Sequence, residues 1–164
     1  MALTYGTATT LAITSANALA SINTTPTAAA SSAAATTSTV GQVVDALVQV
    51  RVVTPAFTPT ASSVVNIYAY ATADGTQYPG ALASSEIIDG TDRTVTLSTL
   101  GNNLVFLGTI QCHTSAGTFT SKPLNIASRF GGTMPKKWGI VLTNALPATI
   151  SITSATVNYT EVAY

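Results

Sequence analysis

Apolar and polar residues alternate with a period of two along much of the chain after residue 45. This alternation is typical of β-strands that bury one face and expose the other. The strongest example lies in the stretch RFGGTMPKKWGIVLTN, residues 129–144. Its predicted core positions are Trp138, Ile140 and Leu142. Gly131, Gly132 and Pro135 predict a tight turn into this strand, because glycine allows unusual backbone angles and proline fixes one.

The same alternation predicts further strands, at residues 47–53, 64–71, 93–100, 103–113 and 149–164, with weaker candidates at 118–120 and 124–126. In residues 103–113 the core positions are Leu104, Phe106, Ile110 and Cys112. A bulge is expected near Ser154. Asp74-Gly75 follows a predicted strand and favours a hairpin turn.

Strands at this spacing are joined by short segments with Gly, Asn and Pro, and no amphipathic helix pattern occurs. Together these features predict an all-β protein built as an antiparallel β-sandwich. Jelly-roll and immunoglobulin-like sandwiches are the two leading versions. The chain has a single cysteine, so it lacks the cysteine pair around a tryptophan that marks immunoglobulin domains. We therefore predict a jelly-roll-like domain over residues 40–164.

Residues 1–39 are rich in Ala, Thr and Ser and carry no charge. Thr and Ser disfavour a helix, because their side chains compete for backbone hydrogen bonds. The apolar residues are widely spaced, as at Leu3, Tyr5, Leu11 and Ile13. We predict an extended N-terminal arm over residues 1–39 that lies on a partner's surface, with disorder as the alternative. Deleting residues 2–39 is then expected to leave a folded domain.

Only 7% of the residues are charged, against about 25% in an average domain. A surface of Thr, Ser, Asn and Ala suits burial against other subunits, because hydroxyl groups are desolvated at lower cost than Lys or Glu. The alternative is the solvent-facing sheet of a secreted β-protein. Six basic residues in total argue against a nucleic-acid role, which needs a continuous basic surface.

The few charges are unevenly placed along the sequence. Four of the six acidic residues lie within 74–92, and four of the six basic residues lie within 122–137. Such separation suits an acidic edge of one subunit that faces a basic edge of another. It is equally consistent with two unrelated loops.

No catalytic or cofactor motif occurs in the sequence,. Cys112 and His113 are the only residues of their types, and as neighbours on a strand they would point to opposite faces, which suits neither a metal site nor a nucleophile with its base. Asp89 and Asp92 could together hold calcium or cleave a glycoside, but an Asx turn is the preferred interpretation. The sequence thus predicts a protein that is not an enzyme and has no metal or cofactor.

Tyrosine buries a large area while its hydroxyl group stays hydrated, so the tyrosines suit an interface patch, a sugar platform or packing within the sandwich. The predicted interface residues are Leu3, Tyr5, Leu11, Ile13, Tyr68, Tyr70, Tyr78, Lys136, Lys137 and Tyr164. The first twenty residues lack a basic start, and Thr and Ser interrupt their apolar positions. Neither a signal peptide nor a membrane span is expected there.

Four segments carry a resemblance to a known family: YAYATADGTQYP (68–79), DGTDRTVTL (89–97), LVFLGTI (104–110) and RFGGTMPKKWGIVLTN (129–144). They resemble small virion structural proteins of tailed bacteriophages, of the jelly-roll type that decorates or cements the head. The similarity covers roughly residues 45–164 in the same order, and the FGG, PxxWGI and final Asn combination is its most specific part. Residues 1–39 have no match in it. Members of the family commonly continue into a short glycine-containing tail where this sequence has Tyr164.

The resemblance implies a protein that binds the outside of an assembled capsid and stiffens it. Its partners would be the phage major capsid protein and further copies of itself in a symmetric dimer or trimer, without nucleic acid or membrane. It would be made in the host cytoplasm and end on the exterior of the virion head. Repetition over the lattice would multiply weak contacts into firm attachment. The alternative is a tail or fibre component that binds a receptor glycan.

Overall fold

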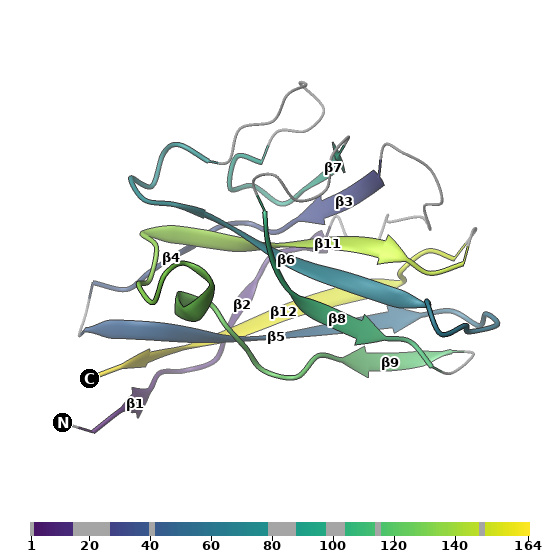
Figure 1. The fold of residues 1–164 in the computed structure, drawn as a ribbon, viewed down its shortest axis with the longest axis horizontal. Coiled ribbons are helices and arrows are strands. Elements are labelled where there is room, and N and C mark those ends of the chain that lie inside the picture. The colour runs from purple at the N-terminus through teal and green to yellow at the C-terminus, as the bar shows by residue number, and fades with distance from the viewer. Residues whose placement is uncertain are drawn as a thin grey trace.

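The computed structural model describes residues 2–14, 27–39, 42–78, 88–97, 104–113, 116–147 and 150–164. These residues form an antiparallel β-sandwich of two six-stranded sheets (Figure 1). No α-helix occurs in the described ranges, and a short 3-10 turn, η3 (Ala127–Arg129), precedes β11. The all-β antiparallel sandwich predicted from the alternation is therefore confirmed.

The first sheet, sheet A, is centred on β5 (Val43–Thr54) and β12 (Ser154–Ala163), which pair along their whole lengths. Its outer strands are β1 (Thr4–Tyr5) and β2 (Thr9–Leu11) beside β12, and β9 (Gly117–Thr120) and β10 (Leu124–Asn125) beside β5. The pairing of β5 with β12 shifts between Val162 and Ala163. The irregularity predicted near Ser154 thus lies at the other end of this strand.

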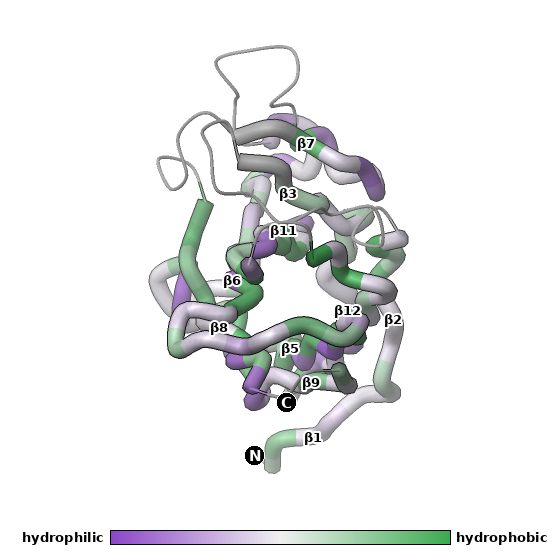
Figure 2. The backbone as a smooth tube through the Cα atoms, turned by 90° about the vertical axis from the view of Figure 1, so that its right-hand side faces the viewer, coloured by the Kyte–Doolittle hydropathy of each residue, from purple (hydrophilic) through white to green (hydrophobic). Residues whose placement is uncertain are grey.

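The second sheet, sheet B, is centred on β11 (Lys137–Ala145) and β6 (Val64–Thr72). Its other strands are β8 (Val105–Gln111) beside β6, β3 (Thr27–Ser31) and β4 (Ala35–Thr36) beside β11, and β7 (Arg93–Leu97) beside β3. The view in Figure 2 shows the strands of both sheets arranged around a common interior.

Most strand pairs are nested along the chain, whereas the pairing of β3 with β7 crosses those of β5 with β9 and of β6 with β8. The first strands, β1 and β2, pair with the last, β12; β3 and β4 pair with β11; β5 pairs with β9 and β10; and β6 pairs with β8. The pairing of β12 with β5 joins the strand pairs of sheet A, and the pairing of β11 with β6 joins those of sheet B.

The interior between the sheets is filled by large apolar side chains from both central strand pairs. Trp138, Ile140 and Leu142 of β11 are fully buried, as the alternation predicts, and face Val48, Val50 and Val52 of β5 in one cluster. Gly131 and Gly132, in the turn before β11, have positive φ angles of 74° and 82°. This backbone conformation is the one that the glycine pair was expected to supply.

The described part of residues 1–39 belongs to the sandwich, which corrects the prediction of a separate arm before a domain at 40–164. Strands β1 and β2 lie in sheet A, and β3 and β4 lie in sheet B. Leu11, Ile13, Ala29 and Ala30 are buried in the two cores. Deleting residues 2–39 would remove strands from both sheets and should unfold the protein. Residues 15–26 of the predicted arm lie outside the described residues.

Phe106 is 48% exposed, which corrects its assignment to the core. The cause is a register shift in the pairing of β6 with β8, where Ile67 lies opposite Gly108 and Tyr68 opposite Phe106. The extra residue, Leu107, turns inward and is buried. A bulge of this kind reverses which residues of a strand face the core, so strict alternation gives the wrong side for Phe106.

Alanine substitutions on either side of this bulge should differ sharply in their effect on stability. We expect Leu107→Ala to lower the free energy of unfolding by about 2–5 kcal/mol, because it empties a core position. Phe106→Ala should cost about 1 kcal/mol or less, mainly the edge-to-face contact with the Tyr68 ring,. Urea unfolding of both variants measures the difference. The reverse order of the two effects would place Phe106 in the core.

Candidate functional site

Three of the four exposed large hydrophobic residues in the described ranges lie at one corner of sheet A. Leu3 is 52%, Tyr5 61% and Tyr164 50% exposed. Strand β1 pairs with the end of β12 through Thr4 opposite Ala163 and Tyr5 opposite Val162, so the same register brings Leu3 opposite Tyr164. Figure 1 shows these two chain segments side by side. We call Leu3, Tyr5 and Tyr164 the apolar corner.

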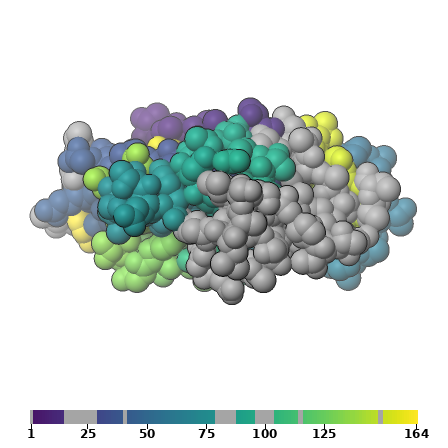
Figure 3. Space-filling view, turned by 90° about the horizontal axis from the view of Figure 1, so that it is seen from above, coloured from purple at the N-terminus to yellow at the C-terminus, as the bar shows by residue number. Residues whose placement is uncertain are grey.

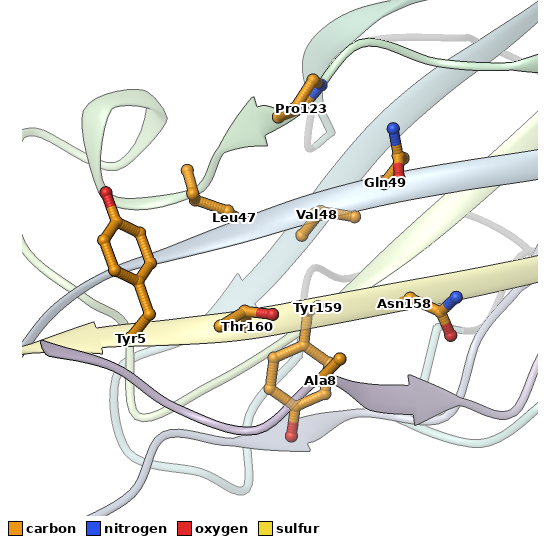
Figure 4. Close-up of a pocket in the computed structure, with 9 residues that line it drawn as sticks. All are labelled: Tyr5, Ala8, Leu47, Val48, Gln49, Pro123, Asn158, Tyr159 and Thr160. Atoms are coloured by element: carbon orange, nitrogen blue, oxygen red, sulfur yellow. The ribbon is translucent and has the colours of Figure 1, made fainter.

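A shallow groove of about 470 Å³ begins at Tyr5 and runs over the outer face of sheet A. It is lined by Tyr5, Ala8, Leu47, Val48, Gln49, Pro123, Asn158, Tyr159 and Thr160. In Figure 4 the side chains of Leu47 and Gln49 come from β5, those of Asn158 and Thr160 from β12, and the Tyr5 ring closes one end. We call this the sheet A groove. None of its lining residues is charged.

Two amide side chains form the polar part of the groove floor. Gln49 and Asn158 are directly opposite each other in the pairing of β5 with β12. The Gln49 Nε2 group donates to the carbonyl oxygen of Ser121 at 3.1 Å, and Asn158 Oδ1 accepts a hydrogen bond from the Thr10 hydroxyl at 2.8 Å. These bonds tie each amide to a neighbouring segment. Gln49 Oε1 and Asn158 Nδ2 have no partner among the described residues.

The alternation of β5 predicted that Gln49 points away from the core, but sequence reasoning did not single out Gln49, Asn158 or Leu47 as candidate site residues. The sequence marks them only by their position, because each lies between residues that face the core. Which residues lie opposite each other depends on the register between β5 and β12, two strands that are about a hundred residues apart. The structure supplies that register.

The remaining predicted interface residues are dispersed over the molecule, and some are buried. Leu11 and Ile13 belong to the main core, and Tyr70 is fully buried on the other side of sheet B. Tyr68 and Tyr78 are half-buried, Lys137 is half-buried and Lys136 is exposed. The predicted set therefore does not form one surface, and only Leu3, Tyr5 and Tyr164 are brought together.

Tyr70 is the largest member of a second, smaller core on the outer face of sheet B. Its hydroxyl group donates to the carbonyl oxygen of Ser32 at 2.8 Å, and its ring lies so close to Gly139 of β11 that a methyl group there would overlap it. The members of this core are Ala29, Tyr70, Ile88, Val95 and Val141. Burial raises the pKa of the Tyr70 phenol. Tyr70 therefore acts in packing and does not offer a sugar platform.

Residues 73–78 and 88–92 cover this second core from outside. The Tyr78 ring packs edge-to-face on Tyr70, with 5.8 Å between ring centroids, and lies against Gly90. Figure 3 shows the segments on either side of residue 80 next to each other on this face. Lys136 donates from Nζ to the Asp74 carbonyl oxygen at 3.0 Å. The acidic segment 74–92 and the basic segment 122–137 thus contact each other within one chain at this point.

The carboxylates of the 89–92 segment are occupied by protein donors. Asp89 accepts hydrogen bonds from the Thr91 backbone and hydroxyl groups and forms an ion pair with Arg93 at 2.9 Å. These hydrogen bonds, from the Thr91 hydroxyl first, lower the pKa of Asp89. Asp92 accepts from the backbone N–H of Thr14 at 2.7 Å. The contacts of Asp89 with Thr91 form the Asx turn that the sequence favoured, whereas Asp92 binds a segment that is distant in the sequence.

Cys112 and His113 point in different directions. The Cys112 thiol is fully buried, and burial raises its pKa to about 11. His113 is exposed and its ring packs edge-to-face on Phe119, with 5.5 Å between centroids. A thiol that stays protonated at neutral pH and faces away from the histidine is a poor nucleophile.

Comparisons with protein-family models, with curated proteins and with solved structures find no match to this chain. In the part of the chain that the structure describes, no helix has the length and apolarity needed to span a membrane.

Proposed function

We propose that this protein is a non-enzymatic virion structural protein of a tailed bacteriophage, which binds the capsid exterior as a decoration or cement protein. The observation that carries the proposal is the apolar corner, where Leu3, Tyr5 and Tyr164 each expose about half or more of their surface. Large apolar side chains that gather on a surface mark sites of protein contact. The major capsid protein is the proposed partner.

Three further features support this proposal. The four segments described above resemble small head-decorating proteins. The nested strand pairs in two sheets agree with a jelly roll, an architecture that recurs in viral capsid proteins and in lectins. The near absence of charge favours burial against neighbours over a free surface, because few ionic groups would need to be desolvated.

Multivalent attachment is the proposed mechanism. A rigid sandwich presents the apolar corner without a large ordering cost, and symmetric copies of the protein engage repeated shell subunits at once. No cofactor or metal takes part. The proposed location is the exterior of the virion head, after synthesis in the host cytoplasm.

Replacing the two outermost residues of the corner tests this proposal. We expect Leu3→Ser combined with Tyr164→Ser to lower the apparent affinity for purified capsid shells about tenfold or more, because contact residues that fill a partner's pockets dominate binding. Co-sedimentation with shells measures the loss. Thermal unfolding should be nearly unchanged, since surface substitutions usually shift stability by about 0.5 kcal/mol or less.

Phe106→Ser is the matched control, because Phe106 is the fourth exposed large hydrophobic residue of the described ranges and lies on sheet B. It should bind shells like the unchanged protein. Full shell occupancy by the Leu3 and Tyr164 double variant would contradict the role of the corner. Locating the protein in an electron-microscopy map of the particle separates the head from the alternative, a tail or fibre component that binds a receptor glycan.

A further inference from the structure

The sheet A groove presents one free hydrogen-bond acceptor and one free donor side by side. Gln49 and Asn158 are opposite residues on adjacent strands, so their Cβ atoms are about 5 Å apart. Because Gln49 uses its nitrogen on Ser121 and Asn158 uses its oxygen on Thr10, Gln49 Oε1 is left to accept and Asn158 Nδ2 is left to donate. Both side chains are already held in place, which lowers the ordering cost of binding.

The rest of the groove is apolar or hydroxylic and uncharged. Tyr5 stands at one end with 61% of its surface exposed, and Leu47 and Pro123 lie along the side of β5 and β10. Thr160 adds a hydroxyl group on β12. The volume of about 470 Å³ lies within the range of small-molecule sites, about 300–1,000 Å³.

These features select the chemistry of the ligand. A phosphate or carboxylate would find no cation among the lining residues, and a purely apolar ligand would leave the two amides without partners, which costs free energy. Neighbouring hydroxyl groups on a ring both donate and accept, so they match an acceptor beside a donor. Tyr5 lies opposite Val162, four residues and about 13 Å along β12 from Asn158,. The C–H face of a further ring of the same saccharide can pack there, because the flat Tyr5 side chain offers apolar area and keeps its hydroxyl hydrated.

We propose that the sheet A groove binds a neutral saccharide of two or more rings, with Gln49 Oε1 and Asn158 Nδ2 on adjacent hydroxyls of one ring and Tyr5 against another ring. This goes beyond attachment to the capsid, and its polar contacts come from Gln49 and Asn158, which the sequence did not suggest. Tyr5 belongs to both the apolar corner and the groove, so a capsid and a saccharide would compete for this ring. Leu3 and Tyr164 lie outside the groove lining, so the two activities are separable.

Side-chain amide NMR signals of the full chain give a direct test. Titration with the neutral disaccharides maltose, cellobiose and lactose should shift the Asn158 and Gln49 side-chain signals for at least one sugar. Glucuronic acid, a charged sugar, should shift them less. Asn158→Asp keeps the oxygen that accepts from Thr10 but replaces the free donor by an acceptor, and should weaken binding about tenfold or more.

Thr156→Ala is the control, because Thr156 is on the same strand but outside the groove lining, and it should bind sugar normally. The Leu3 and Tyr164 double variant should also bind sugar normally, and Asn158→Asp should bind shells normally. Unshifted amide signals with all three disaccharides would overturn the proposal, as would unchanged binding by Asn158→Asp. Amide shifts that depend only on protein concentration would instead assign the groove to a second copy of this chain.

Discussion

Gly139→Ala should destabilise the folded protein by about 1–3 kcal/mol, although alanine is normally the better residue within a strand. The reason is the ring of Tyr70, which crosses β11 over Gly139 and occupies the space of an added methyl group. To make room, the ring must move and give up its hydrogen bond to the Ser32 carbonyl oxygen. Denaturant unfolding, followed by the fluorescence of the single tryptophan, measures the change.

A double-mutant cycle identifies the overlap with Tyr70 as the cause. In the Tyr70→Leu background the aromatic ring is gone, so adding Gly139→Ala should cost little, and the coupling between the two positions should be about 1–3 kcal/mol. Gly108→Ala is the matched glycine control. Gly108 also lies in a strand, but a methyl group there would meet only Leu124 Cδ2 at 3.4 Å. An equal cost of Gly139→Ala in both backgrounds would contradict this explanation.

Ser32 shows why the segment before residue 40 was assigned to an arm. Its hydroxyl group accepts from the backbone N–H of Ile140 at 2.9 Å and its backbone N–H donates to the Ile140 carbonyl oxygen at 2.8 Å, so β11 is paired across the gap between β3 and β4. The side chains buried here are small, as at Ala29 and Ala30. Alternation reveals a strand through large apolar residues. A strand such as β3, whose buried side chains are small, lacks that signal.

The central strands were predictable because their core residues are large and regularly spaced. Val48, Val50 and Val52 on β5 and Trp138, Ile140 and Leu142 on β11 all face the interior. Positions that depend on a second strand were not predictable in the same way. The bulge opposite Tyr68 turns Phe106 outward, and the pairing of Gln49 with Asn158 arises only once β5 and β12 lie together.

Of the candidate site, Leu3 and Tyr5 were predicted from the wide spacing of apolar residues near the start of the sequence, and Tyr164 because tyrosine suits an interface. Their meeting at one corner required the pairing of β1 with β12. Leu11 and Ile13 have the same kind of sequence surroundings but are buried. The difference is that the chain after β2 reaches the sheet B segment between β3 and β4, where the Ala12 carbonyl oxygen accepts a hydrogen bond from the Ala33 N–H group. Local sequence does not encode that crossing.

Trp138→Ala should lower the free energy of unfolding by about 3–5 kcal/mol, the usual cost of emptying a buried site of this size. Trp138 is the largest of the fully buried side chains, and its ring packs edge-to-face on Tyr159 with 5.1 Å between centroids. Because it joins β11 to the sheet A strand β12, its loss leaves a cavity at the contact between the sheets. Circular dichroism follows the unfolding, since no tryptophan remains as a fluorescent probe.

Trp138→Phe should be far milder, at about 1 kcal/mol or less. The indole N–H of Trp138 is buried and has no hydrogen-bond partner among the described residues. Phenylalanine removes this group, and the desolvation cost of about 1–3 kcal/mol that an unpaired donor carries offsets the packing lost with the smaller ring. A cost of Trp138→Phe that exceeds half the cost of Trp138→Ala would contradict this offset.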